Sequence, residues 1–380
     1  MTVTVWDDLV GQEQLAAQLA EAATESRAMT HAWLFVGPAG SGRSTAALAF
    51  AAALQDPTAR KDSTEVKAVL AGTHPDVTLV STEAVILRAE VIRPLIELAQ
   101  RTPARGRWRI IIIEDADRLN ETSGNVLLKA IEEPPERTVW LLCAPSAADV
   151  LTTVRSRSRV VSLRTPAPEQ VAQLLQQRDG IDADTAAEVA RISLSHVGVA
   201  RRLATDPKAR ARRQQVLELA SQINDAADAI VVAGEIVDTV KQEAESLATE
   251  RNEAEQNELL RIHGVEPGAT VPRPVATELR TLKEEQKRRD TRATRDQLDR
   301  ALLDLISLYR DVLVTQLAPG QDIINTDFAE TVQYLAGCST SAQTLTHITA
   351  IEQARARLAR NVAPLLAIEA LSVELAPSSS

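Results

Sequence analysis

The sequence contains few aromatic residues and very few cysteines. Tryptophan, tyrosine and phenylalanine make up 2% of its 380 residues, against 44% for hydrophobic residues as a whole. The cores must therefore consist mainly of alanine, leucine, valine and isoleucine, and the abundance of alanine and glutamine favours helix. The two cysteines, Cys143 and Cys338, are too few for a disulfide framework or a zinc cluster. Cys143 lies in an apolar, strand-like run and is predicted to be a small buried hydrophobic residue.

The chain also lacks long apolar segments and an excess of positive charge. No apolar run approaches the length of a membrane span, and the first residues show neither the basic nor the apolar region of a signal peptide. We therefore expect a soluble protein of the cytoplasm. The formal net charge is −10, which argues against a protein that coats nucleic acid by itself but allows contact through a local basic face or within a larger assembly.

Residues 1–165 alternate strand-like and helix-like segments, the pattern of a parallel sheet covered by helices. Four consecutive isoleucines at 110–113 are apolar without alternation, as expected for a strand buried on both faces. Short β-type runs occur at 32–36, 77–80, 109–113, 139–144 and 160–163. The sequence therefore predicts an α/β domain over this region.

Two helical regions are predicted to follow. Residues 166–206 begin with two prolines that break the preceding pattern and then show only short helical segments, which indicates a small helical module. Residues 207–375 are predicted to form an all-helical domain, because apolar residues between Leu298 and Leu313 recur at i, i+3 and i+4. Residues 376–380 are predicted to be a disordered tail.

A charged stretch at about 241–300 interrupts the pattern of the last domain. Residues 241–262 are helical and acidic, a loop rich in glycine and proline follows, and residues 276–300 are helical with an excess of basic residues. Two helices of opposite charge folded against each other account for this arrangement. We favour a solvated hairpin with ion pairs between its helices over a DNA-binding arm.

A phosphate-binding loop is predicted between the first strand and the next helix, because Gly37-Pro38-Ala39-Gly40-Ser41-Gly42-Arg43-Ser44 fits G-x-x-x-x-G-K-[ST] except at the lysine. In such loops backbone N–H groups and a helix N-terminus surround phosphate, lysine reaches the outer phosphates and the hydroxyl holds magnesium. Arginine keeps the charge, but its planar guanidinium does not replace a compact ammonium group. We expect a loop that shapes the fold without supporting hydrolysis. Its candidate nucleotide-binding residues are Gly37, Gly40, Gly42, Arg43, Ser44 and Thr45.

Two carboxylates follow the isoleucine strand. In P-loop enzymes the first acid after this strand assists magnesium, and the second acts as a base toward the attacking water. The usual order is aspartate then glutamate, whereas this chain has Glu114 and then Asp115. Since a displacement of about 1 Å can lower a catalytic rate by about 100-fold, this order also points away from hydrolysis.

Two further motifs lie nearer the end of the predicted sheet. The first is Leu127-Leu128-Lys129-Ala130-Ile131-Glu132-Glu133-Pro134-Pro135. The second, which precedes the last strand, is Arg155-Ser156-Arg157-Ser158-Arg159. Short basic runs are usually solvated surface, but an arginine after the fourth strand is placed to reach the nucleotide of a neighbouring subunit and stabilise charge there.

Together these segments resemble the AAA+ subunits of bacterial replicative clamp loaders. The resemblance rests on the segments at 6–12, 31–38, 127–135 and 156–158. It covers residues 1–206 closely and the remainder more loosely. It implies a P-loop AAA+ domain, a helical lid and a helical collar domain that joins subunits into an open ring. It also implies that Arg201, in the segment Gly198-Val199-Ala200-Arg201, faces a nucleotide site.

The family contains ATP-hydrolysing (gamma/tau) subunits and subunits that brace the ring and lend an arginine to a neighbour's ATP site. Three features favour the bracing type: Arg43, the order of the two acids, and Ala144-Pro145 in place of a polar sensor. They argue against a hydrolysing subunit and against another AAA+ motor, such as a branch-migration helicase. The resemblance then assigns the trans-acting catalytic arginine to Arg157. The expected partners are the ATPase (gamma/tau) and delta subunits and, through the complex, the sliding clamp and primed DNA, within the DNA polymerase III holoenzyme, a nucleotidyltransferase. No membrane partner is expected.

The chain departs from this family where a zinc module is usual. Subunits of this type generally carry four cysteines after the P-loop helix, but residues 55–70 contain none. Ser63 and Val66 stand about where ligands would be, and a zinc site is therefore not expected. The cofactor that stays open is ATP, bound by the loop without hydrolysis.

Overall fold

The computed structural model describes residues 3–25, 29–38, 40–81, 86–223, 225–265, 272–360 and 362–376. The chain divides into two compact units, Met1–Thr205 and Asp206–Ser380. Within the described residues, no helix is both long enough and apolar enough to cross a membrane. The predicted tail lies outside the described residues from Pro377 onward.

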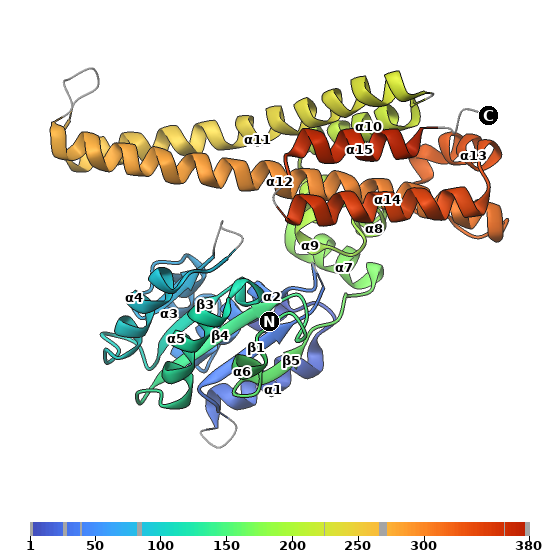
Figure 1. The fold of residues 1–380 in the computed structure, drawn as a ribbon. Coiled ribbons are helices and arrows are strands. Elements are labelled where there is room, and N and C mark those ends of the chain that lie inside the picture. The colour runs from blue at the N-terminus through green and yellow to red at the C-terminus, as the bar shows by residue number, and fades with distance from the viewer. Residues whose placement is uncertain are drawn as a thin grey trace. The chain divides into compact units, whose positions relative to one another are not determined.

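A five-stranded sheet forms the centre of the first unit (Figure 1). Its strands are β1 (Ala32–Val36), β2 (Val77–Val80), β3 (Arg109–Ile113), β4 (Thr138–Ala144) and β5 (Arg159–Ser162). All neighbouring strands are parallel, in the order β2-β3-β4-β1-β5. β1, β3 and β4 are buried along their whole length, which explains their unbroken apolar sequences. The predicted α/β fold class is confirmed.

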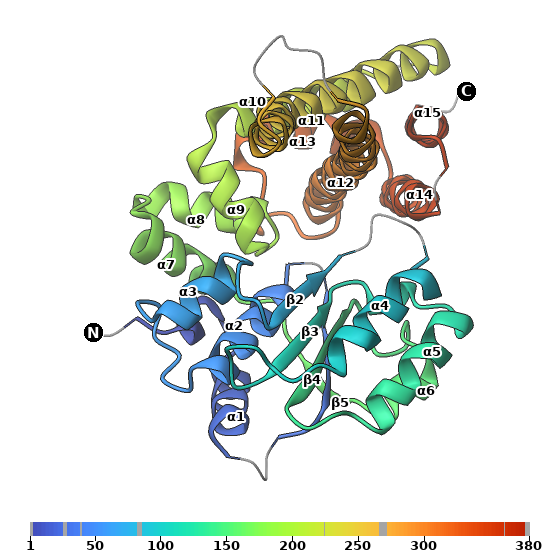
Figure 2. The ribbon, with the colours of Figure 1, turned by 90° about the vertical axis from the view of Figure 1, so that its left-hand side faces the viewer.

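Helices cover both faces of this sheet (Figure 2). One face carries α1 (Glu13–Thr24), α2 (Arg43–Gln55) and α3 (Thr64–Leu70), together with the 3-10 helix η1 (Val5–Asp8). The other carries α4 (Ala89–Ala99), α5 (Glu121–Glu132) and α6 (Thr152–Arg155), and the 3-10 helix η2 (Ala116–Arg118). Along β1, Trp33 and Phe35 pack into the first core, while Leu34 and Val36 pack into the second. Successive side chains therefore fill two separate apolar cores.

Three short helices complete the first unit: α7 (Pro168–Asp179), α8 (Ala183–Ile192) and α9 (Val197–Thr205). α7 begins with a proline, which suits the first helical position, and ends before Gly180 in the left-handed conformation. The side chain of Asp182 accepts a hydrogen bond from the Thr185 N–H at the start of α8. α8 packs against both α7 and α9, so the three helices form one small module.

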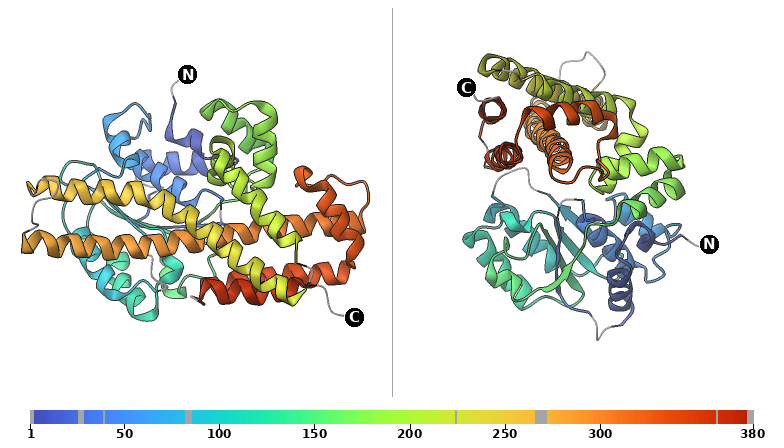
Figure 3. Two further views of the ribbon diagram at one scale, coloured as in Figure 1. Left: turned by 90° about the horizontal axis from the view of Figure 1, so that it is seen from above. Right: turned by 90° about the vertical axis from the view of Figure 1, so that its right-hand side faces the viewer.

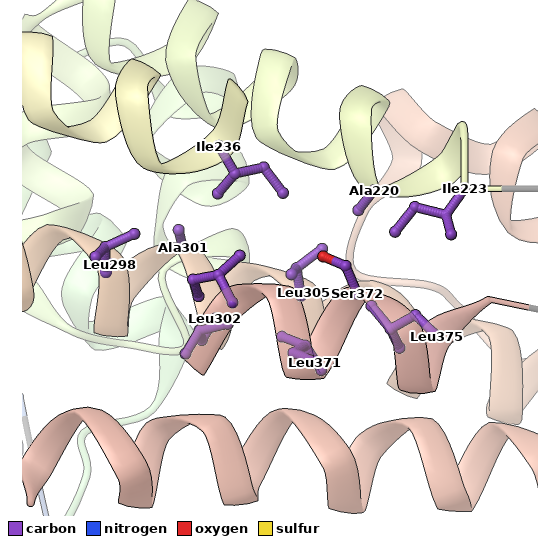
Figure 4. Close-up of a pocket in the computed structure, with 11 residues that line it drawn as sticks. Ala220, Ile223, Ile236, Leu298, Ala301, Leu302, Leu305, Leu371, Ser372 and Leu375 are labelled. Carbon is purple, nitrogen blue, oxygen red and sulfur yellow. The ribbon is translucent and has the colours of Figure 1, made fainter. Parts of the chain in front are cut away.

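The second unit consists of helices in its described part. These are α10 (Pro207–Ser221), α11 (Ala226–Ile262), α12 (Arg273–Leu317), the 3-10 helix η3 (Thr326–Phe328), α13 (Ala329–Cys338), α14 (Ser341–Ala359) and α15 (Pro364–Leu375). α11, α12, α14 and α15 share one apolar core, to which Val237, Leu302, Ile351 and Leu371 contribute. A cavity of about 10 Å³ lies within this core (Figure 4). It holds at most one water molecule, so this core is closely packed.

α11 and α12 continue past this core side by side, as a charged arm at residues 241–265 and 272–297 (Figure 3). The two predicted hairpin helices, at 241–262 and 276–300, lie against each other as expected, and they are the distal parts of two longer helices. No proline breaks α11, and the only proline within α12 stands in its first turn. A change in charge therefore does not mark a helix boundary here.

The charged arm is held mainly by polar contacts between its helices. Arg289 Nη2 lies 2.5 Å from Glu255 Oε2, and Asn252 Nδ2 donates to Asp290 Oδ2 at 2.8 Å. The expected ion pairs between the helices are therefore present. Among the described side chains of the arm, the buried apolar ones are Ala244, Ala248 and Val275.

Candidate functional site

The predicted phosphate loop joins the C-terminal end of β1 to the N-terminus of α2. Gly40 and Gly42 have φ angles of 82° and 88°, in the left-handed region that favours glycine. Gly42 directly precedes the first turn of α2, which contains Ser44 and Thr45. Ala39 lies outside the described residues. The loop thus keeps the turn and the helix N-terminus with which such loops bind anions.

Arg43, at the start of α2, turns back onto the loop. Its Nη1 donates a hydrogen bond of 2.6 Å to the carbonyl oxygen of Gly37. A lysine in this position extends toward the outer phosphates of a nucleotide, whereas this guanidinium links the first residue of the loop to nearly the last. The loop's own cation is therefore engaged with the backbone.

Glu114 and Asp115 follow directly after β3, and β4 separates this strand from β1. Because the strands are parallel, these acids share one edge of the sheet with the phosphate loop. Asp115 Oδ1 lies 3.7 Å from Arg118 Nε. Ala144, at the end of β4, pairs in register with the last residue of β1 and offers no polar side chain between the acids and the loop.

Burial raises the pKa of two groups, one just after β3 and one near the end of β4. Burial raises the pKa of Asp117, and the charge of Asp115 adds to the rise while that of Arg43 opposes it. Burial also raises the pKa of Cys143 on β4 to about 12, with Glu114 acting in the same direction. Cys143 is therefore a neutral thiol at neutral pH, and the prediction of a small buried hydrophobic residue is confirmed.

The helical module places His196 at the loop. The imidazole ring lies so close to Gly40 that a Cβ at that position would collide with it. The two residues before His196 have φ angles of 51° and 62°, which forms the tight turn that leads into α9. Arg201, in α9, lies with Nε 3.0 Å from Asp179 Oδ1, and its side chain is 58% exposed. Its predicted role toward a nucleotide stays a prediction.

The three arginines at 155–159 have three different environments. Arg155 donates from Nη1 to the carbonyl oxygen of Ala147 at 3.0 Å. The guanidinium of Arg159 lies 4.7 Å from the ring centroid of Trp33, in a cation–π contact. Arg157, between them, is directed to a carboxylate on another helix.

The ion pair of Arg157 joins two motifs that lie 25 residues apart. Arg157 Nε lies 2.5 Å from Glu132 Oε1, at the end of α5, and their side chains are 40% and 42% exposed. α5 approaches the segment before α6 closely because Gly124 has no side chain, and a Cβ there would collide with Leu151. The guanidinium is therefore oriented and accessible at the same time.

The stretch that lacks the family's cysteines is closed by other contacts. Ser63, which precedes α3, donates from Oγ to Asp56 Oδ2 at 2.5 Å. This hydrogen bond lowers the pKa of Asp56. Val66 is fully buried in the core. In the part of the chain that the structure describes, no group of three or more His, Cys, Asp or Glu side chains could hold a metal ion.

A family model described as "DNA polymerase III, delta subunit" matches residues 11–167. The match runs from the N-terminal segment through the phosphate loop, the two acids and the arginine motif to the end of the sheet. Residues 11–167, which contain the five-stranded sheet, are therefore similar to DNA polymerase III clamp-loader subunits. The sheet order and the position of the loop agree with the architecture that the resemblance implies.

Curated relatives of this region include two types of DNA polymerase III subunit. The DNA polymerase III subunit delta' of Pseudomonas aeruginosa is 35% identical over 151 residues, which cover 38% of this chain and 45% of the relative. The delta' subunit of Bacillus subtilis is 26% identical, over 46% of this chain and 54% of the relative. The subunit gamma/tau of Mycobacterium tuberculosis (strain ATCC 25618 / H37Rv) is 32% identical, over 47% and 32% respectively. This chain thus spans between about a third and about a half of these relatives.

Two residues of the first unit that make contacts at the site received no role from the sequence. His196 stands two residues before the sensor-like segment, and Glu132 belongs to the Glu-Glu-Pro-Pro string. Polar residues inside or beside recognised motifs are a signal that could have marked both. Their contacts with Gly40 and Arg157 depend on how helices distant in sequence pack, and local patterns do not contain that information.

Proposed function

We propose that this chain is a delta-prime subunit of the DNA polymerase III clamp loader. In this role it braces the ring of subunits and supplies Arg157 to the ATP site of a neighbouring subunit, so that the sliding clamp is loaded on primed DNA. Its partners are then the gamma/tau and delta subunits. The AAA+ domain itself belongs to both candidate subunit types, so the choice rests on the chemistry of the site.

The hydrogen bond from Arg43 to the Gly37 carbonyl is the observation on which we prefer the delta-prime role. To hold the outer phosphates as an active P-loop does, the Arg43 guanidinium has to give up its hydrogen bond to the backbone and turn into the loop. The guanidinium is planar and larger than an ammonium group, and it already has a good acceptor at 2.6 Å. We infer that any nucleotide that enters this loop stays bound without turnover.

The remaining groups support the same role. Asp115 is one methylene shorter than the usual base and lies beside Arg118, and Ala144 supplies no polar side chain at the end of β4. Arg157, by contrast, keeps an exposed guanidinium on the surface. The chain thus has an incomplete hydrolytic site of its own and an arginine suited to another.

An ATP-hydrolysing gamma/tau-type subunit is the second candidate, because a gamma/tau relative is 32% identical over 192 residues. The two candidates differ in ATP turnover by the purified chain. A delta-prime subunit is expected to hydrolyse ATP negligibly, with or without primed DNA. Steady turnover that is lost in Arg43→Ala would assign the chain to the hydrolysing type.

The role of Arg157 is tested in a complex reconstituted with gamma/tau and delta subunits. Loss of a trans-acting arginine lowers turnover at the site it serves by about 1000-fold or more, so Arg157→Ala is expected to impair clamp loading strongly while the variant still assembles. Arg101→Ala, which removes another exposed arginine of the same unit, is the matched control. Normal clamp loading by the Arg157→Ala complex would contradict the proposal.

A further inference from the structure

An open groove of about 450 Å³ runs along the charged arm of the second unit. Four cations line it, namely Lys241 on α11 and Lys283, Lys287 and Arg295 on α12. The two carboxylates in its lining are Glu245 and Asp290. Positive charge therefore prevails in this groove, although the net charge of the whole chain is −10.

Four arginines of the arm outside the groove lie beside carboxylates, whereas the groove cations have no such partner among the described residues. Arg251, Arg261, Arg289 and Arg292 each lie within 4.0 Å of a carboxylate oxygen. In the described part of the chain, no ion pair involves any of the four groove cations, and the Nε of Arg295 is buried without a hydrogen-bond partner. These four arginines thus have carboxylate partners within the chain, whereas the groove cations are available to bind another anion.

One of the two groove carboxylates already has partners. Asp290 Oδ2 accepts a hydrogen bond from Asn252 at 2.8 Å, and its Oδ1 lies 3.7 Å from Arg251. Glu245 is thus the carboxylate that weakens the positive potential most directly. An anion in the groove thus meets four cations, Glu245, and an Asp290 whose charge is partly balanced by Arg251 outside the lining.

The spacing of the cations suits an extended polyanion. Lys283, Lys287 and Arg295 lie four and eight residues apart on one face of α12, which corresponds to about 6 and 12 Å along the helix axis. A nucleic-acid strand carries a negative charge at every nucleotide, about 3.4 Å apart along each strand of a duplex. The row of cations can therefore contact several phosphates of one strand.

The lining of the groove argues against a protein partner. Pro364 is its only apolar residue among those described, whereas protein interfaces have an apolar, often aromatic, centre. The lining also contains no aromatic side chain on which a base could stack. We propose that this groove binds the sugar–phosphate backbone of a nucleic acid, irrespective of its base sequence, by direct contact with this chain.

Binding of the purified full-length chain to short labelled single-stranded and duplex DNA, followed by fluorescence anisotropy, tests the proposal. The dissociation constant is expected at about 10⁻⁴–10⁻⁶ M near physiological salt, as for other contacts to phosphates alone. Four phosphate contacts predict a slope of log affinity against log salt between about −3 and −4. Two DNA duplexes of unrelated sequence are expected to bind equally.

The double variant Lys283→Gln/Lys287→Gln is expected to weaken binding and to reduce the salt slope by about two, since each lost phosphate contact removes about one. Arg273→Gln/Arg280→Gln is the matched control, because it removes the same charge from exposed positions of the same helix outside the groove. Circular dichroism verifies that both variants keep their helices.

Three results would overturn the inference: no binding by the wild-type chain at low salt, equal losses in both double variants, or equally tight binding of polyglutamate. Equal losses would indicate general charge attraction, and polyglutamate binding would indicate an acidic protein segment as the occupant. The inference does not depend on the proposed function. Arg157→Ala, in the other unit, is expected to bind DNA like the wild type, so the two proposals fail separately.

Discussion

Arg157 and Glu132 form the contact on which the proposed role of the first unit depends most directly. Both side chains are about two-fifths exposed, and an ion pair at such a surface contributes about 0.2–1 kcal/mol. Its effect on folding is therefore small. Its main effect is to orient the arginine, because it restricts a long side chain that would otherwise sample many rotamers. Glu132 is thus a positioning residue for Arg157.

Glu132→Gln is expected to lower ATP turnover of the reconstituted complex by at most about fivefold, the equivalent of about 1 kcal/mol. The loss should be smaller than that caused by Arg157→Ala and should disappear in the double variant, where no arginine is left to orient. Glu133→Gln removes the same charge from the next residue and is the matched control. A loss of equal size in Glu133→Gln would show that the charge, and not the contact, matters.

At the scale of elements, a single carboxylate fixes the start of β3. Asp76, just before β2, accepts hydrogen bonds of 2.7 Å from the N–H groups of Ala104, Arg105 and Gly106. It also lies 2.9 Å from Arg109, whose side chain is 5% exposed. Burial alone would raise the pKa of Asp76, but the three N–H donors and Arg109 outweigh it and hold the pKa below its usual value.

Asp76→Asn is expected to destabilise the first unit by about 3–5 kcal/mol at neutral pH, because it leaves a buried arginine unpaired. Since the pKa of Asp76 is lowered by folding, its contribution is complete above the unfolded value of about 3.9 and is lost as the pH falls through the folded value. The difference between wild type and variant should therefore shrink below about pH 4.

Tryptophan fluorescence during urea unfolding measures this effect selectively, because all four tryptophans belong to the first unit. Asp62→Asn is the control, since Asp62 also has a lowered pKa but pairs with Arg60 at the surface. That variant is expected to shift the unfolding midpoint little. A midpoint of Asp76→Asn equal to that of the wild type would contradict the assignment.

For the whole molecule, the sequence was most informative where burial imposes a pattern. The strands of the sheet were predicted to within one residue. For β1, β3 and β4 the reason is that buried parallel strands are continuous apolar runs bounded by turns. The phosphate loop, the two acids and the arginine motif were recognised because their order along the chain reflects their place at the ends of strands.

Side-chain partners were less accessible to prediction. Arg43 was expected to disturb phosphate binding, yet its bond to Gly37 depends on the rotamer it adopts inside the folded loop. The pairing of Arg157 with Glu132 depends on the packing of α5 against α6. The sequence predicted the charged hairpin but not that its helices continue those of the apolar core, since charge on an exposed helix face hardly affects helix continuation.

α12 joins two very different environments in one helix of 45 residues. From Leu298 to Val312 its buried residues pack into the shared apolar core, whereas toward Arg273 the helix is held by polar contacts with α11. Amide hydrogens are therefore expected to exchange with deuterium slowly in the former segment and much faster in the latter. Mass spectrometry of peptides along α12 measures this gradient, and uniform protection would contradict it. One uninterrupted helix then contains both long-lived and short-lived backbone hydrogen bonds.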